Sequence, residues 1–178
     1  MKRYYIAYGS NLNVGQMRRR CPGATILGTA TLNDWGLLFR GSKTGSFLTI
    51  EEKEGGRVPV AVWEVTPADE DALDHYEGFP RFYYKKEIRI QFRGIVTGRR
   101  RTVTAFVYIM HEDRPIGIPT TIYMQTCLEG YDAFRFDRRV LFEAYDRSKR
   151  EKELDCWPRE VKLDCWPRGK EENDHEED

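Results

Sequence analysis

Short segments that alternate apolar and polar residues fill much of the first 110 positions, a pattern typical of strands. The first, residues 3–8, is aromatic and β-branched and stops at Gly9. The other predicted strands are residues 24–32, 37–40, 47–51, 58–65, 83–92 and 102–110. Helical segments interrupt these strands too irregularly for a doubly wound sheet. We therefore predict an α+β fold of six or seven strands, a small mixed β-barrel or strongly curled sheet with a few flanking helices.

Turn-forming residues separate the predicted strands. Asn33-Asp34-Trp35-Gly36 predicts a bend, and Glu54-Gly55-Gly56-Arg57 predicts a hairpin between residues 47–51 and 58–65. The basic, glycine-bearing segment 93–101 predicts another hairpin turn, with Arg99, Arg100 and Arg101 at a solvated tip.

The clearest helix signal begins at Thr66. Thr66 is a typical N-cap, Pro67 suits the first helical position, and acidic residues follow in the first turn. This helix is expected to run to about Tyr76 and to stop at Gly78. Three more helices are predicted: residues 13–20 with Asn11 or Asn13 as cap, residues 120–128 after Pro119 and closed by Gly130, and residues 138–150 capped by Asp137.

The character of the chain changes after residue 150. The hexapeptide Leu-Asp-Cys-Trp-Pro-Arg occurs at 154–159 and again at 163–168, and the last ten residues hold six acidic groups. Two copies are too few for a repeat architecture. We predict one domain over residues 1–150 and a charged, disordered tail over 151–178.

Charge and cysteine content limit the classes of function. The chain has 29 basic and 29 acidic residues, so a whole-molecule nucleic-acid or membrane-surface binder is not expected. It has no apolar run of membrane-spanning length and no secretory signal core. The cysteines at 21, 127, 156 and 165 form no CxxC pair. These features predict reduced thiols, a cytoplasmic location and no metal site.

The first candidate site is the loop Tyr8-Gly9-Ser10-Asn11-Leu12, where the opening strand gives way to a helix. Glycine permits close backbone approach to a ligand, and serine and asparagine supply side-chain donors. Successive N–H groups in such a turn can hold a carboxylate or an oxyanion. The alternative is an ordinary strand–helix turn with a capping asparagine.

The second candidate is Glu77, which shares a helix face with apolar Leu73 and lies near Phe79 and Phe82. A carboxylate on an apolar face has a raised pKa, as a general acid/base at neutral pH requires. The alternative is that Glu77 faces solvent or pairs with Arg81. A third candidate, Tyr123, is either a phenol facing the pocket or a core tyrosine.

Other catalytic designs find less support. Ser10 lies in no GxSxG elbow, so a serine-hydrolase triad is disfavoured. His75 and His111 have no partner at metal-ligand spacing.

Taken together, the three candidates resemble one family. Residues 8–12 (YGSNL), the block Leu73-Asp74-x-x-Glu77-Gly78, and Pro119, Tyr123 and Gly130 occur in the order and spacing of the gamma-glutamylcyclotransferase superfamily, AIG2-like members included. The resemblance covers about residues 3–131. It departs at Thr120, where a serine often follows the proline.

The resemblance implies an enzyme that cyclises a γ-glutamyl amine or γ-glutamyl amino acid to 5-oxoproline and releases the free amine, with no cofactor. It assigns general acid/base catalysis to Glu77, and substrate binding to Tyr8, Gly9, Ser10, Asn11 and Leu12, with Tyr123 beside the pocket. Residues 41–46 and 111–118 are candidate specificity loops. The sequence indicates neither the leaving group nor the oligomeric state.

Three other interpretations remain open from the sequence. One is a non-catalytic protein of the same fold that binds a small carboxylate. Another is a nucleic-acid-binding module that uses the basic segment 93–101, against which the zero net charge argues. The third is an interaction protein that recruits a partner through Trp157 and Trp166.

Overall fold

A computed structural model describes residues 2–42 and 45–155 of the 178-residue chain. Within these residues, five strands close into a barrel in the order β1-β3-β2-β4-β5. All neighbouring strands are antiparallel except β1 and β5, which are parallel. The closed barrel confirms the predicted fold class. The strands are β1 (Arg3–Ala7), β2 (Thr25–Ser42), β3 (Gly45–Val65), β4 (Tyr83–Gly94) and β5 (Arg100–Met110).

The prediction of six or seven strands was wrong because two long strands each contain a break in the pattern. Residues 24–32 and 37–40 join into β2, and residues 47–51 and 58–65 join into β3. Where a hairpin was predicted, β3 instead carries an irregularity opposite Asp34, whose carboxylate accepts a 3.0 Å hydrogen bond from the N–H of Gly55. Both halves of β3 pair with β2, so the two strands bend together around the barrel.

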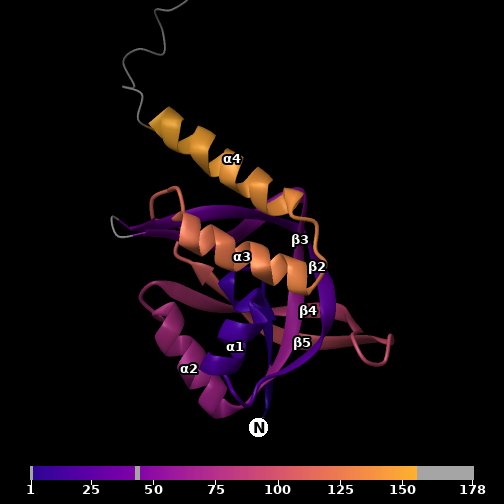
Figure 1. The fold of residues 1–178 in the computed structure, drawn as a ribbon. Helices are drawn as coiled ribbons and strands as arrows, with labels where there is room; N and C mark the ends of the chain where they lie inside the picture. Colours follow the sequence, from indigo (N-terminus) through magenta and orange to yellow (C-terminus); the bar gives the residue numbers. More distant parts are fainter. Residues whose placement is uncertain (1, 43–44, 156–178) are drawn as a thin grey trace, which may run out of the picture.

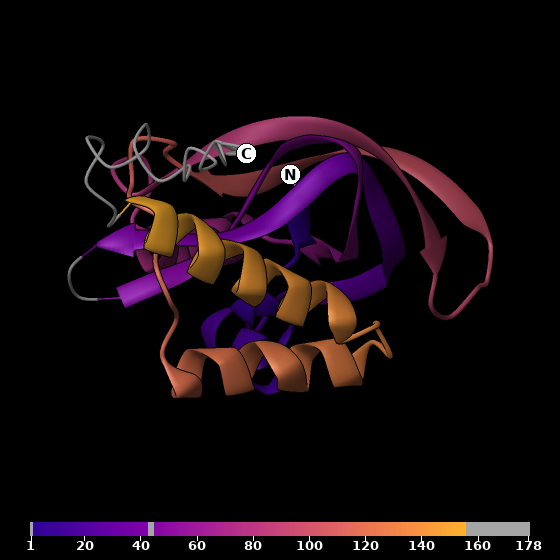
Figure 2. The ribbon, with the colours of Figure 1, turned by 90° about the horizontal axis from the view of Figure 1, so that it is seen from above.

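In the part of the chain that the structure describes, four α-helices and one short 3-10 helix lie outside the barrel (Figure 1). Seen from above, α3 and α4 lie side by side over one side of the barrel, and the β4–β5 hairpin curves away on the other (Figure 2). α1 and α2 lie together at the lower end of the barrel in Figure 1. The helices are η1 (Ser10–Leu12), α1 (Val14–Arg20), α2 (Pro67–Glu77), α3 (Thr121–Ala133) and α4 (Arg139–Asp155).

The ends of α2 follow the prediction closely. The Thr66 hydroxyl accepts from the N–H of Asp69, and the Asp69 carboxylate accepts from the N–H of Thr66, so the two form a capping box. Gly78 ends the helix with φ 64°, in the left-handed region that favours glycine. Lys85 of β4 anchors the helix to the barrel through ion pairs of 2.5 Å to Glu70 and 2.7 Å to Asp74.

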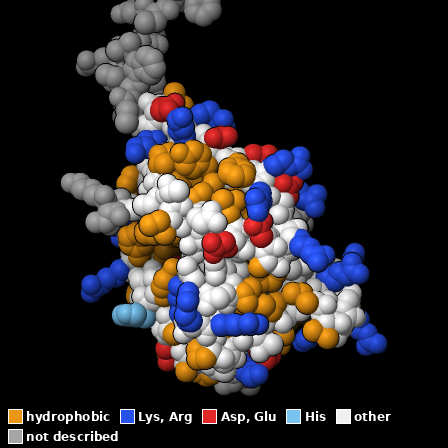
Figure 3. All heavy atoms as spheres, viewed as in Figure 1, with side chains coloured by type: hydrophobic (Ala, Val, Ile, Leu, Met, Phe, Trp, Pro, Cys, Tyr) orange, Lys and Arg blue, Asp and Glu red, His pale blue; other side chains and the backbone are white. Residues whose placement is uncertain are grey.

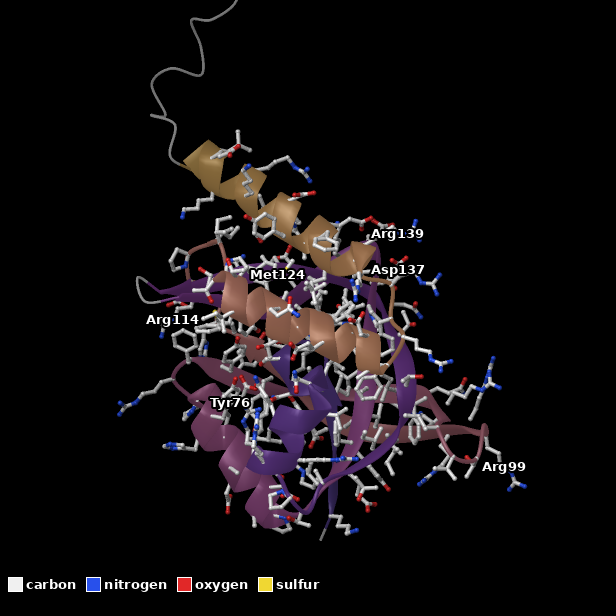
Figure 4. The ribbon with its side chains drawn as sticks, viewed as in Figure 1. Tyr76, Arg99, Arg114, Met124, Asp137 and Arg139 are labelled. Atoms are coloured by element: carbon white, nitrogen blue, oxygen red, sulfur yellow. The ribbon has the colours of Figure 1, made fainter. Side chains whose placement is uncertain are left out.

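Two helix ends differ from the prediction. Gly130 does not close α3 but lies inside it, where a Cβ would come within 2.6 Å of the Leu12 side chain. The glycine is therefore required for contact between α3 and η1. α4 continues past residue 150 to Asp155, and its N-terminal region is held by Asp137, which accepts from the N–H of Arg139 at 2.9 Å (Figure 4).

Several sequence predictions concern other parts of the chain. Residues 156–178 lie outside the described residues; they include the second copy of the hexapeptide, the cysteines and tryptophans of both copies, and the acidic end. Cys21 and Cys127 are buried and free. Among the described residues, no helix is long and apolar enough to cross a membrane, and no three His, Cys, Asp or Glu side chains are grouped as for a metal ion.

The surface is mixed in character. On the face shown in Figure 3, basic side chains are interspersed with acidic and hydrophobic ones. Arg99 lies at the far end of the β4–β5 hairpin and points away from the barrel (Figure 4), and Arg100 and Arg101 are also exposed. The predicted solvent exposure is therefore confirmed, but Arg100 and Arg101 belong to β5, where they pair with Arg93 and Phe92, and do not lie at the tip itself.

Candidate active site

The loop from β1 into η1 brings the predicted binding residues to one end of the barrel. Gly9 is the N-cap of η1, and the first bond of this helix runs from the N–H of Leu12 to the carbonyl of Gly9 at 2.9 Å. The N–H groups of Ser10 and Asn11 lie ahead of that bond. Although Ser10 and Asn11 are polar, they are buried, with 8% and 3% of their surface exposed.

Glu77, at the last position of α2, meets this loop directly. Its Oε1 accepts a 2.7 Å hydrogen bond from Nδ2 of Asn11, 66 positions earlier in the chain. Glu77 is partly buried, and Leu73 on the same helix face is fully buried. No ion pair between Glu77 and Arg81, both within the described range 45–155, is found, and the carboxylate is instead hydrogen-bonded to Asn11.

The surroundings of Glu77 change its acidity. Burial raises the pKa of its carboxyl from the ordinary 4.5 to about 7, because removal from water disfavours the charged form. The positive charge of Arg20 and the hydrogen bond from Asn11 lower the pKa and so limit the rise. A carboxyl with a pKa near 7 can both accept and donate a proton at neutral pH.

Glu77 lies between an outer cavity of about 290 Å³ and a narrow inner recess of about 20 Å³. The outer cavity is close to the lower size limit of small-molecule sites, and most of its lining is aromatic. It is lined by Ser10, Phe47, His75, Tyr76, Glu77, Gly78, Phe82, Tyr83 and Tyr123. The recess adds Tyr5, Tyr8, Gly9, Asn11, Leu48 and Tyr108.

The predicted loop residues contribute to the site in different ways. The Ser10 hydroxyl faces the cavity, 3.4 Å from the Tyr76 hydroxyl. The Tyr8 hydroxyl donates to the carbonyl of Tyr108 at 2.7 Å and so is held by backbone. The Leu12 side chain is fully buried and borders neither the cavity nor the recess.

Tyr123 projects from α3 into the space between Gly9 and β3. Its hydroxyl accepts a 3.1 Å hydrogen bond from the N–H of Leu48, and a Cβ on Gly9 would lie 3.4 Å from it. Its ring packs edge-on against Phe47 with centroids 5.1 Å apart. Tyr123 is therefore both a packed tyrosine with a bonded hydroxyl and part of the cavity wall, which combines the two interpretations of the sequence.

We expect Tyr123→Phe to lower the free energy of unfolding by about 1–3 kcal/mol, because the buried N–H of Leu48 loses its acceptor. Urea unfolding measures this change. Tyr145→Phe, on α4, is the matched control, because no hydrogen bond of its hydroxyl is found within the described residues. Equal stability of the two variants would contradict the expectation.

Sequence reasoning missed six residues of the site: Tyr5, Arg20, Phe47, Leu48, Tyr83 and Tyr108. Arg20 ends the basic run of α1, and its guanidinium donates to Oδ1 of Asn11 and lies 3.2 Å from the centre of the Tyr76 ring. Figure 4 shows Tyr76 on α2 where this helix faces α1. No local signal identifies Phe47 or Tyr83, because only barrel closure brings their strands to the loop.

The fold and the site together define a small closed-barrel protein with a partly buried carboxyl beside an aromatic cavity of small-molecule size. Residues 5–125 match the family described as "Gamma-glutamyl cyclotransferase, AIG2-like". This match spans more than half of the sequence, and the chain belongs to that family.

Individual relatives agree with this assignment. The gamma-glutamylcyclotransferases of Homo sapiens and Mus musculus are each 29% identical to the chain over 119 residues, which is 62% of this chain and 62% of either relative. The match therefore spans less than two thirds of the length of these relatives.

Solved structures support the fold. One described as gamma-glutamyl cyclotransferase superposes with a TM-score of 0.65 at 25% identity, covering 84% of this chain and 87% of that one. YkqA from Bacillus subtilis superposes with a TM-score of 0.64 at 16% identity, covering 88% of this chain and 55% of that one. The likeness to YkqA concerns the fold alone.

Proposed function

We propose that the protein is a cyclotransferase that converts a γ-glutamyl amine or γ-glutamyl amino acid into 5-oxoproline and the free amine. The observation that carries the proposal is the Glu77 carboxyl, which has a pKa raised to about 7 and borders a cavity beside the loop of residues 8–12. Family membership and the match to gamma-glutamylcyclotransferases support the choice of substrate class.

The proposed reaction needs no nucleophile from the protein. The α-amino nitrogen of the substrate attacks its own γ-carbonyl carbon, a C–N bond forms to close the five-membered lactam, and the original amide C–N bond breaks. Glu77 accepts the proton released by the attacking nitrogen and donates it to the departing nitrogen, so the enzyme ends as it began. Holding the chain in the reactive geometry can supply about 7–11 kcal/mol of the barrier in such intramolecular reactions.

The remaining tasks fall to the loop and to the cavity wall. The backbone N–H groups of Ser10 and Asn11 precede the first bond of η1 and are the donors proposed for the substrate carboxylate or the developing oxyanion. Gly9 keeps space open beside the Tyr123 hydroxyl. We expect the aromatic lining to keep the Glu77 carboxyl removed from water, the condition that raises its pKa.

The direct test is to incubate the protein with a panel of γ-glutamyl amines and γ-glutamyl amino acids and to measure 5-oxoproline by mass spectrometry. We expect release from at least one member, with the free amine formed in equal amount. Binding of these compounds without turnover of any of them would contradict the proposal and favour a non-catalytic protein that binds small carboxylates.

A further inference from the structure

The side chain of Arg20 contacts an amide and an aromatic ring beside the candidate site. It ends α1, and its guanidinium turns toward the loop, where Nη1 donates to Oδ1 of Asn11 and the plane covers the Tyr76 ring at 3.2 Å from the centroid. The salt bridges found within the described part of the chain do not include Arg20. An amide and an aromatic ring hold this charge in place.

The hydrogen-bond partners of the Asn11 side chain determine which end of its amide carries the oxygen. Nδ2 donates to Oε1 of Glu77 at 2.7 Å and to the Tyr5 hydroxyl at 2.8 Å, which uses both of its hydrogens. Oδ1 is left for a donor, and a guanidinium can only donate. If the amide were rotated by half a turn, an oxygen would face the Glu77 carboxylate and an NH₂ group would face Arg20. Arg20 therefore determines which end of Asn11 meets Glu77.

Arg20 also acts on Glu77 through its charge. Its charge and the Asn11 hydrogen bond oppose the desolvation that raises the pKa of Glu77. The other groups around Glu77 provide no comparable charge: burial raises the pKa of the surrounding phenols, so they stay neutral at pH 7, and His75 lies on α2 at the exposed side of the cavity. These phenols belong to Tyr5, Tyr8, Tyr83, Tyr108 and Tyr123.

We propose that Arg20 is a positioning residue for Glu77: it orients Asn11 so that Nδ2 faces the carboxylate, and it sets the pH range in which Glu77 can accept a proton. The proposal rests on the proposed function for its catalytic meaning. The contacts among Arg20, Asn11 and Glu77 do not depend on substrate, so they can be tested without turnover.

The test is a ¹³C NMR titration of the side-chain carboxyls, in which the Glu77 signal is identified by its absence from Glu77→Gln. In Arg20→Gln we expect the Glu77 midpoint to rise by about one pH unit or more, since an opposite charge this close typically shifts a carboxyl by 1–3 units. Arg20→Lys keeps the charge and is expected to keep a midpoint near that of the wild type. Arg19→Gln, an exposed neighbour on the same helix, is the matched control and should leave the midpoint unchanged.

The same variants are then compared for 5-oxoproline release against pH. In Arg20→Gln the rising limb of kcat/KM should move to higher pH with the NMR midpoint, which a loss of packing alone would not cause. An unshifted Glu77 midpoint in Arg20→Gln would overturn the proposal. If the midpoint shifts but the wild-type protein releases no 5-oxoproline, the effect of Arg20 on Glu77 is confirmed. The proposed function, and not the role of Arg20, is then overturned. If Arg20→Gln does not fold, Arg20→Met, whose chain can pack on Tyr76, provides the same neutral comparison.

Discussion

Glu77→Gln is expected to lower the rate of 5-oxoproline release by about 10²–10⁴-fold, the usual contribution of a positioned general acid/base. Glutamine has the shape of glutamate and can still accept the hydrogen bond from Asn11, so the loop keeps its geometry. It cannot carry a proton between the two nitrogens. Steady-state assays at pH 7 measure the loss, with Asp71→Asn, an exposed carboxyl on the same helix, as the matched control. Wild-type turnover by Glu77→Gln would remove the mechanism.

The same substitution has a stability signature with a definite sign. Because the pKa of Glu77 is raised in the folded state to about 7, the wild type loses stability as pH rises from about 4.5 through 7. Glu77→Gln lacks this loss. Relative to wild type, the variant should therefore gain stability between pH 4 and pH 8, by at most about 3 kcal/mol. Urea unfolding of both proteins at the two pH values measures the gain. If the difference in unfolding free energy between variant and wild type were the same at pH 4 and pH 8, the raised pKa would be contradicted.

Gly130→Ala is expected to reduce both stability and activity, although alanine is the better helix former by about 1 kcal/mol. The added Cβ would lie 2.6 Å from Cβ of Leu12, 2.8 Å from the Leu12 backbone carbon and 2.9 Å from the Asn13 nitrogen. Overpacking of this kind costs about 1–3 kcal/mol. The contact is with the end of the loop that carries Ser10 and Asn11, and a displacement of about 1 Å there can lower the rate by about 10²-fold.

Gly15→Ala is the matched control, because Gly15 lies in α1 and is exposed. Its added Cβ would meet only Oδ1 of Asn13 at 3.4 Å, an ordinary contact. We expect this variant to be slightly more stable than wild type and equally active. Thermal unfolding and 5-oxoproline assays on both variants measure the contrast. If Gly130→Ala were as stable and active as Gly15→Ala, α3 would not position the loop.

The strands differ in how well the sequence pattern predicts them. The β4–β5 hairpin was predicted because its alternation is continuous and its turn is a single basic, glycine-bearing segment. β2 and β3 were each divided in two because local turn signals at Asp34 and Gly55 are the same whether the chain reverses or bulges. Only the partner strand distinguishes these outcomes: Phe47–Ile50 pairs with Leu37–Arg40, not with the residues after Gly56.

The candidate site likewise has some features that local sequence predicts and others that depend on the tertiary structure. The sequence by itself determined the local pieces: the Gly9 turn after β1, and the α2 helix with its Thr66 cap and Gly78 end, which carries Glu77 in its last turn. Each depends on residues within a few positions of one another, where caps, glycine conformations and helical periodicity act.

Only the tertiary structure decided how these pieces work together. The contact between Asn11 and Glu77 spans 66 positions, and that between Leu48 and Tyr123 spans 75. The desolvation of Glu77 exists only after the barrel closes around it, and the orientation of the Asn11 amide depends on donors and acceptors from three separate elements at once. Local sequence patterns do not predict such long-range contacts, because each contact forms only when several elements that are distant in sequence are in place at the same time.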